Sequence, residues 1–219
     1  IYKVKGASKN TYTSGVVCAK VSRYAERTHH PDRLTKPLMR VGKKGSNDFK
    51  EIEWEQALDI VAENFISTAQ KHGTESIWPY FYAGTMGLVQ RDGINRLRHA
   101  MKYSGQHSTI CSTITASGFR AGVGTLKGPD PREMALADVI LVWGCNPAST
   151  QVNVMKHIQK ARKDRNAKLI VVDPYKTRSA KVADFHYAIK PGTDGALACS
   201  IMHILFRDNY ADKEYMDKY

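Results

Sequence analysis

The sequence predicts an α/β fold: a doubly wound, mostly parallel sheet with flanking helices. Two short, continuous apolar runs, residues 139–143 and 169–172, are typical of strands buried on both faces of such a sheet. The segment between them, residues 152–163, fits a crossover helix. A further strand at 185–189 and a further helix at 195–207 continue the alternation that characterises doubly wound sheets.

The first 50 residues are expected to form strands and loops. This segment is rich in Lys, Arg, Gly, Ser and Thr, and Pro31 and Pro37 interrupt any long helix. An amphipathic helix over 54–71 follows, because apolar side chains recur there at helical spacing, and Gly73 provides its stop signal. The apolar positions of this helix are Trp54, Leu58, Val61, Ala62 and Phe65.

The middle of the chain alternates between apolar runs and helical patterns. Residues 76–82 form an apolar, aromatic run, and residues 88–103 have the pattern of a helix. A short strand is expected to end near Ile110, with helical segments beyond Cys111. This order leads into the strands and helices of the predicted sheet.

The composition limits the class of protein. With 219 residues, 42% of them hydrophobic, the chain has enough apolar side chains for a sizeable core. Its 33 Lys and Arg residues outnumber the 21 acidic residues, and the formal charge of +12 favours anionic partners such as phosphates, nucleic acids or acidic surfaces. No block of consecutive basic residues marks a nucleic-acid-binding arm, so no nucleic acid partner is expected.

The chain is expected to be soluble, with reduced thiols. No apolar stretch approaches the length of about 18 residues that a membrane span needs, and none of these 219 residues forms a signal peptide, which leaves open a leader before Ile1. The four cysteines include no C-x-x-C pair, which excludes a small disulfide framework, and the histidines lack the spacing of a zinc site. Because the sequence starts at Ile1 and ends after a helical pattern, we expect a piece of a longer protein.

Small and polar residues follow the predicted strand that ends at Trp143. The loop 144–150, with the sequence GCNPAST, lets the backbone approach a ligand closely. Its side chains Asn146, Ser149 and Thr150 either bind that ligand or cap the next helix. Ligands of open α/β sheets bind at the carboxyl ends of strands, so this loop is a candidate binding site.

The ends of the later strands carry polar groups as well. Asp173 follows a strand, where a carboxylate can hold a ribose diol, and Lys176 and Arg178 are placed to meet phosphate. Thr193 and Asp194 precede the last predicted helix, and they either cap it or accept hydrogen bonds from a purine base. Each of these motifs by itself is common on protein surfaces.

Six stretches together resemble the molybdopterin oxidoreductases of the dimethyl sulfoxide reductase family. They are Cys18-Ala-Lys20, His30-Pro-Asp-Arg-Leu34, Ser108 to Gly118, Trp143-Gly-Cys-Asn-Pro147, Val171-Val-Asp-Pro174 and Lys190 to Gly195. They occur in the family's order and span nearly the whole chain. Since the family holds its metal between two pterin dinucleotides, the resemblance implies a bis-molybdopterin guanine dinucleotide cofactor with molybdenum or tungsten.

The resemblance also implies which residues contact this cofactor. In the family, the loops at the strand ends contact the guanosine half of one dinucleotide, and a loop matching residues 80–84 adds further contacts. The cofactor-binding residues implied here are Tyr82, Gly84, Trp143, Gly144, Cys145, Asn146, Pro147, Ser149, Thr150, Asp173, Pro174, Tyr175, Lys176, Thr177, Gly192, Thr193 and Asp194.

Cys111 occupies the position from which family members supply a ligand to the metal. A thiolate suits molybdenum or tungsten because it is a soft ligand. Taken by itself, one cysteine next to Ile110 and Thr113 is more often a small buried hydrophobe. The resemblance favours the catalytic metal ligand.

Cys18 and Lys20 match residues of the family's iron-sulfur domain. Cys18 matches the last of four cysteines that bind a 4Fe-4S cluster, and the other three would lie upstream of this chain. Lys20 matches a catalytic, cofactor-binding lysine that lies between the cluster and the pterin, where it bonds to the pterin edge and favours electron transfer. The alternative for Lys20 is a solvated charge in a basic loop.

The resemblance implies two regions, residues 1–50 as the remnant of a 4Fe-4S domain with its connecting segment, and residues 51–219 as an incomplete α/β dinucleotide-binding domain. The whole enzyme is expected to exchange two electrons with a small-molecule substrate in the cytoplasm or periplasm. Its expected partners are the remainder of the same enzyme and an iron-sulfur electron-transfer subunit. Three alternatives stay open: a nucleotide- or NAD-binding Rossmann-like module without molybdenum, a non-redox, hydratase-type member of the family, and a basic nucleic-acid-binding domain, which the charge alone supports.

Overall fold

The structure, a computed structural model, describes residues 2–81, 87, 92–107 and 112–218. Contacts between residues group the chain into two compact units. The first unit comprises residues 1–29 and 128–219, and the second unit comprises residues 30–127. The predicted boundary near residue 50, between a cluster-binding remnant and a dinucleotide-binding domain, stays a prediction.

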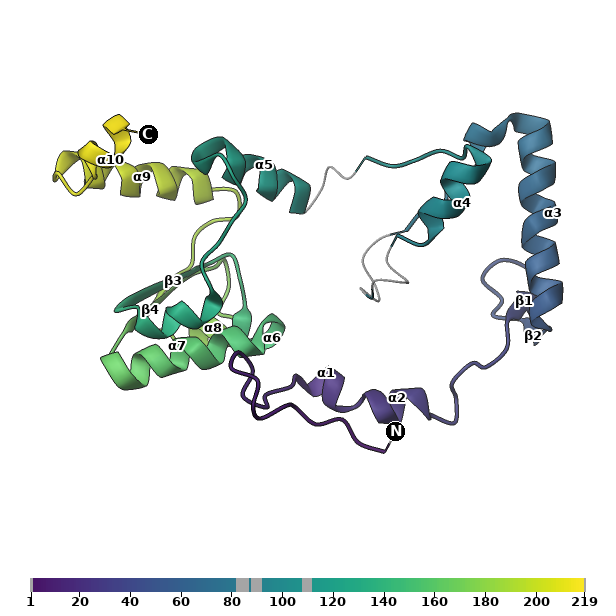
Figure 1. The fold of residues 1–219 in the computed structure, drawn as a ribbon, viewed down its shortest axis with the longest axis horizontal. Coiled ribbons are helices and arrows are strands. Elements are labelled where there is room, and N and C mark those ends of the chain that lie inside the picture. The colour runs from purple at the N-terminus through teal and green to yellow at the C-terminus, as the bar shows by residue number, and fades with distance from the viewer. Residues whose placement is uncertain (1, 82–86, 88–91, 108–111, 219) are drawn as a thin grey trace. The chain divides into compact units, whose positions relative to one another are not determined.

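The first unit is built around a parallel sheet of three strands (Figure 1). The strands are β3 (Val139–Trp143), β4 (Lys168–Val172) and β5 (Phe185–Tyr187), in the order β3-β4-β5. Val142 lies beside Val171 in the register, and Val172 lies beside Tyr187. The apolar runs therefore form the predicted parallel strands, and the α/β class is confirmed. β3 is buried on one face only, because its residues alternate between exposed and buried.

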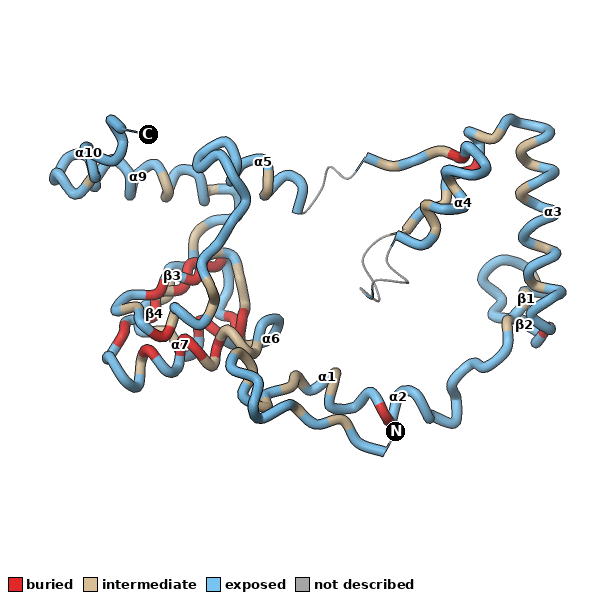
Figure 2. The backbone as a smooth tube through the Cα atoms, in the orientation of Figure 1, coloured by how far each residue is buried: buried red, intermediate tan, exposed pale blue. Residues whose placement is uncertain are grey.

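Three helices of the first unit follow the strands closely. They are α6 (Pro147–Thr150), α7 (Val152–Arg165) and α8 (Arg178–Lys181). α7 is the predicted crossover helix between β3 and β4. The core, which Figure 2 shows as the main concentration of buried residues, consists of Ile140, Val142, Met155, Ile158, Ala161, Ala167, Leu169, Val171 and Ala180.

The other face of the sheet is apolar, and no residue that the structure describes covers it. Val139 and Leu141 on β3 are 60% and 49% exposed, and Phe185 and Tyr187 on β5 are 50% and 54% exposed. Side chains alternate across a strand, so these four face away from the buried core. A second layer of helices would lie here in a doubly wound sheet.

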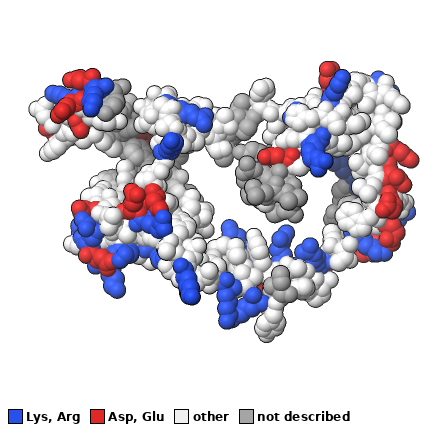
Figure 3. All heavy atoms as spheres, in the orientation of Figure 1, with Lys and Arg blue, Asp and Glu red and all other residues white. Residues whose placement is uncertain are grey.

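The first 29 residues contain two short helices, α1 (Ala19–Ser22) and α2 (Tyr24–Thr28), where the sequence predicted strands and loops. Cys18 caps α1, because its Sγ accepts a hydrogen bond from the backbone N–H of Val21. Cysteine is an uncommon cap and each helix is about one turn long, so no sequence pattern marked them. Figure 3 shows Lys and Arg side chains gathered over α1 and α2.

Two further helices end the first unit. After β5 the chain forms α9 (Asp194–Arg207), as predicted, and then α10 (Lys213–Lys218). A short 3-10 helix, η2 (Pro131–Leu136), precedes β3 and packs against α7. Within the parts of the chain that the structure describes, no helix is both long enough and apolar enough to cross a membrane.

The second unit combines a small hairpin with helices. β1 (Leu38–Arg40) and β2 (Phe49–Glu51) pair in antiparallel fashion. α3 (Trp54–His72) confirms the predicted amphipathic helix and ends at Gly73, whose φ of 85° favours glycine. A short 3-10 helix, η1 (Thr74–Ser76), follows it.

Two predicted elements of the second unit border the residues that the structure leaves out. α4 (Ile94–Met101) lies within the predicted helix 88–103, of which residues 88–91 are outside the described residues. α5 (Ser112–Val123) is the predicted helix beyond Cys111. The strand expected to end near Ile110 also falls outside the described residues.

Candidate functional site

Three loops of the first unit meet at one edge of its sheet, where the parallel strands end. The backbone N–H of Gly144, after β3, donates to the carbonyl of Val172 at 2.9 Å. The backbone N–H of Asp173, after β4, donates to the carbonyl of Tyr187 at 3.2 Å. These bonds fix the starts of the first two loops at the edge where ligands of open α/β sheets bind.

A side-chain hydrogen bond joins two of the predicted motifs. The indole N–H of Trp143, at the end of β3, donates to a carboxylate oxygen of Asp194 at 2.7 Å. Asp194 lies in the first turn of α9, where a negative charge is stabilised by the helix dipole. The bond leaves one carboxylate oxygen of Asp194 free of Trp143, at the exposed surface.

The loop 144–150 is tied to α8 by a buried serine. Ser179 is fully buried, and its hydroxyl donates to the Asn146 Oδ1 at 2.8 Å and accepts from the backbone N–H of Ala148 at 3.0 Å. Asn146 therefore supports the loop through its Oδ1, and it does not cap α6 with its side chain. Sequence reasoning missed Ser179, since no motif or spacing marks a serine that connects two loops.

The remaining residues of this loop differ in how exposed they are and in whether their side chains already have hydrogen-bond partners. Pro147 is buried, whereas Ser149 and Thr150 are exposed. The Thr150 hydroxyl lies 3.0 Å from the Asn146 carbonyl, and the Cys145 thiol donates to the Gln151 Oε1 at 3.2 Å. Thr150 and Cys145 thus have partners in or directly after the loop, and Ser149 is exposed to solvent.

The loop after β4 divides into a fixed part and an exposed part. Asp173 is 7% exposed, and its Oδ1 accepts from the backbone N–H of Tyr175 at 3.1 Å. Thr177 is buried and caps α8, because its Oγ1 accepts from the Ala180 N–H at 3.1 Å. Between them, Pro174, Tyr175 and Lys176 are exposed.

A histidine that the sequence did not single out supports the same loop. The Nε2 of His186, on β5, lies 3.0 Å from the Asp173 carbonyl, which can only accept, so this nitrogen donates. The bond holds the backbone of Asp173 against the neighbouring strand.

The loop before α9 turns at Gly192, whose φ is 83°. Thr193 donates its hydroxyl hydrogen to the Lys190 carbonyl at 2.7 Å and makes no side-chain cap of α9. A Cβ placed on Gly192 or on Gly144 would meet no atom within 4 Å, so the space beside both glycines is open. Open backbone next to exposed polar side chains allows a ligand to approach the main chain closely at this edge.

The structure describes only some of the residues predicted to bind the metals and the rest of the cofactor. Cys111, Tyr82 and Gly84 lie outside the described residues. Cys18 is half-buried, and the hydrogen bond from the Val21 N–H lowers the pKa of its thiol below the ordinary value. Lys20 is exposed on α1. Among the described residues, no three of the His, Cys, Asp and Glu side chains group as metal ligands.

Comparison with known sequences identifies the family. The family model for molybdopterin oxidoreductase matches residues 33–216. The chain is 38% identical over 220 residues to the "Probable oxidoreductase YoaE" of Bacillus subtilis (strain 168), covering 100% of this chain and 32% of that protein. It is 28% identical over 215 residues to the dimethyl sulfoxide reductase DmsA of Escherichia coli (strain K12), covering 92% of this chain and 26% of that protein.

A solved structure agrees with the sequence comparison on the fold. The chain matches the acetylene hydratase from Pelobacter acetylenicus with a TM-score of 0.56 and 24% identity, over 93% of this chain and 28% of that chain. These relatives are therefore much longer than the stretch they share with it. The matched residues include the sheet, its three edge loops and α3, and the chain belongs to the molybdopterin oxidoreductase family.

Proposed function

We propose that this chain forms part of a molybdenum or tungsten oxidoreductase that carries bis-molybdopterin guanine dinucleotide, and that its edge loops bind the guanosine half of one dinucleotide. The observation that carries the proposal is the hydrogen bond between Trp143 and Asp194 at 2.7 Å. It unites the loop after β3 with the start of α9, next to open backbone at Gly144 and Gly192. The chain spans 26% and 32% of the two named relatives, so the activity proposed is that of the whole protein.

Different side chains at this edge of the sheet would bind the base, the ribose and the phosphates of the dinucleotide. Asp194 has a carboxylate oxygen free of Trp143 to accept hydrogen bonds from the N–H groups of a guanine base. Asp173, fixed by the Tyr175 N–H, has a second oxygen to accept from a ribose hydroxyl. Lys176 is exposed and brings a positive charge for phosphate. When bound, the cofactor supplies the two-electron chemistry, and these residues bind and orient it.

Two further residues are proposed to serve the metals. Cys111 would offer its thiolate as a soft ligand to molybdenum or tungsten. Cys18 would be one of the four ligands of a 4Fe-4S cluster, and the lowered pKa of its thiol favours the thiolate that such a cluster requires. Lys20 would hold its positive charge between the cluster and the pterin.

The proposed enzyme acts on a small molecule and passes its electrons through the cluster to an iron-sulfur partner subunit. The remainder of the enzyme would complete the cluster and the substrate funnel. The opposing candidate is a nucleotide-binding module without molybdenum.

Metal and nucleotide analysis of the complete native protein tests the proposal. We expect molybdenum or tungsten near one atom per protein, together with iron, and release of a guanine nucleotide on acid hydrolysis. A protein that contains neither metal and releases an adenine dinucleotide would contradict the proposal and support the Rossmann-like alternative. Metal and guanine nucleotide without redox turnover would instead indicate the hydratase-type chemistry.

A further inference from the structure

A tight turn near the start of the chain, residues 10–16, is rigid by its own hydrogen bonds. The Asn10 Oδ1 accepts from the backbone N–H groups of Tyr12 and Thr13 at 3.0 and 2.8 Å. The Asn10 carbonyl accepts from the Ser14 N–H at 2.7 Å. Gly6 packs so closely against this turn that a Cβ on it would lie 2.0 Å from the Gly15 carbonyl oxygen. We call this segment the N-terminal turn.

Two adjacent residues of α7 hold the N-terminal turn. The Tyr12 carbonyl lies 3.0 Å from the His157 Nε2 and 3.3 Å from the Lys156 Nζ, and both nitrogens donate to it. The rings of Tyr12 and His157 stack, with centroids 5.4 Å apart and an angle of 19° between planes. The Lys156 ammonium also donates to the Ser14 hydroxyl. His157 is only 4% exposed, so this contact is part of the packed interior.

Arg132 adds a second attachment from η2. Its guanidinium donates to the Thr11 hydroxyl at 2.7 Å while the Asp130 carboxylate holds it by paired hydrogen bonds.

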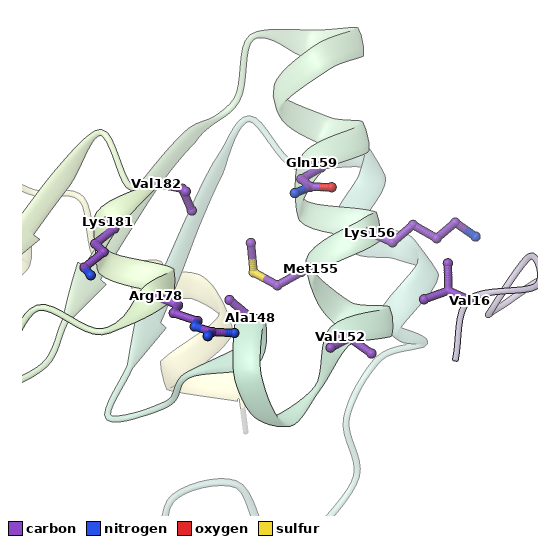
Figure 4. A pocket seen from close by; sticks show the side chains of 9 residues that line it. All are labelled: Val16, Ala148, Val152, Met155, Lys156, Gln159, Arg178, Lys181 and Val182. Atoms are coloured by element: carbon purple, nitrogen blue, oxygen red, sulfur yellow. The ribbon is translucent and has the colours of Figure 1, made fainter. Parts of the chain in front are cut away.

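Val16, at the end of the turn, lines an apolar groove on α7. Figure 4 shows Val16 beside Val152 and Lys156, with Met155 deeper in the groove. Several residues of the N-terminal turn are therefore attached to α7 and η2, through the groove, the stacked rings and the guanidinium contact. Such a segment has little freedom to shift along α7.

α7 adjoins the predicted dinucleotide site at its start and, through the N-terminal turn, the predicted cluster ligand Cys18. α7 begins directly after the loop 144–150, and Cys18 lies two residues beyond Val16. We propose that His157 and Lys156 are positioning residues, which fix the place of the cluster ligand Cys18 and of Lys20 relative to the dinucleotide loop. This inference rests on the proposed function. In this proposal α7 determines the distance between the cluster and the pterin, and the rate of electron transfer depends on that distance.

Variants of α7 in the complete native enzyme test this inference. His157→Phe keeps a stacked ring and removes the Nε2 donor, and Lys156→Met keeps the aliphatic stem and removes the ammonium group. Lys156→Arg restores donors and charge, and Lys160→Met is the matched control, since Lys160 pairs with Asp164 at 2.5 Å on the same helix and makes no contact with the turn among the described residues.

The readouts are the rate of iron loss to a chelator and the magnetic interaction between the reduced cluster and the molybdenum(V) or tungsten(V) centre, which depends on their separation. We expect iron loss to be about tenfold faster in H157F and K156M, because both residues hold the turn that precedes Cys18. Removing groups that hydrogen-bond directly to a metal ligand lowers metal affinity by about 10–100-fold, and the contact here is one step further away. The magnetic interaction should change as well, while guanine nucleotide content stays that of the wild type. K156R and K160M should behave like the wild type.

Three results would count against the inference in different ways. Unchanged iron loss and magnetic interaction in both variants would overturn it. Loss of guanine nucleotide together with iron, at a lower unfolding temperature, would show that the contact only supports folding. A wild-type enzyme with molybdenum and guanine nucleotide but without iron would contradict the cluster assignment itself, and the metal content of the wild type separates that failure from the other two.

Discussion

At the scale of single residues, Ser179 connects α8 to the loop 144–150. Its hydroxyl satisfies the Ala148 N–H and the Asn146 Oδ1 at a fully buried position. Ser179→Ala should therefore cost about 1–3 kcal/mol locally, the penalty for leaving buried polar groups unpaired. Hydrogen exchange of the Ala148 amide in the complete protein would show this as faster exchange. The matched control is Ser200→Ala, which removes an exposed hydroxyl on α9.

Trp143 leads to a second prediction at this scale. Trp143→Phe keeps an aromatic ring at the end of β3 and removes the N–H that orients Asp194. A hydrogen bond from a neutral donor to a charged acceptor contributes about 1.5–3 kcal/mol to stability. Because Asp194 is exposed to solvent, we take about 1 kcal/mol for this bond. We expect about fivefold weaker retention of guanine nucleotide, measured as nucleotide released per protein after dialysis. Trp54→Phe, at an exposed residue of α3, should leave retention unchanged, and equal retention in W143F and the wild type would contradict the assignment.

At the scale of elements, the sheet and its crossover helix were predictable, whereas the contacts among loops were not. The strands were predictable because their apolar residues follow one another in the sequence, as is typical of strands in a parallel sheet with helices on its faces. The pairing of Trp143 with Asp194 depends on how far apart three strands place their ends, which no local pattern encodes. The roles implied for Asn146 and Thr177 stay predictions, and both side chains already hold the loops in place.

The short helix η2 yields a prediction about pH. Its cap Asp130 accepts hydrogen bonds from Arg132, which lower the pKa of the carboxyl from 3.8 to about 2. Because the pKa in the folded state lies below that of the unfolded chain, the carboxylate stabilises the folded state above pH 3.8. This stabilisation is lost as the pH falls toward about 2.

Asp130→Asn should therefore lower the unfolding temperature above pH 3.8, and the difference from the wild type should shrink as the pH falls toward about 2. Thermal unfolding of the complete protein across this range measures the effect. Asp212→Asn, at the start of α10, is the control. A difference that stays constant with pH would show that the ionised form of Asp130 contributes nothing.

At the scale of the whole molecule, the open face of the sheet sets a requirement for assembly. Val139, Leu141, Phe185 and Tyr187 form an apolar surface on β3 and β5 that the described residues leave exposed. Surfaces of this kind mark contacts with other protein segments or lead to aggregation. We infer that further polypeptide covers this face in the complete enzyme.

Leu141→Lys tests that inference in two settings. In residues 1–219 expressed alone, the added charge should reduce self-association in sedimentation experiments, because it interrupts the apolar surface. In the complete enzyme, the same change should lower the yield of folded protein, because it buries a charge without a partner. Leu126→Lys, at a residue that is 50% exposed in the second unit, is the control. A complete enzyme that tolerates L141K would show that this face meets solvent.

The bond between Trp143 and Asp194 also places a fluorophore at the candidate site. The chain has three tryptophans, and the other two, Trp54 and Trp78, belong to the second unit. The emission of an indole responds to its N–H hydrogen bond and to nearby charge, and both involve the carboxylate proposed to receive guanine. In a Trp54→Phe, Trp78→Phe background, Trp143 would be the remaining tryptophan of this chain. Its emission would follow the arrival of the dinucleotide without any added label.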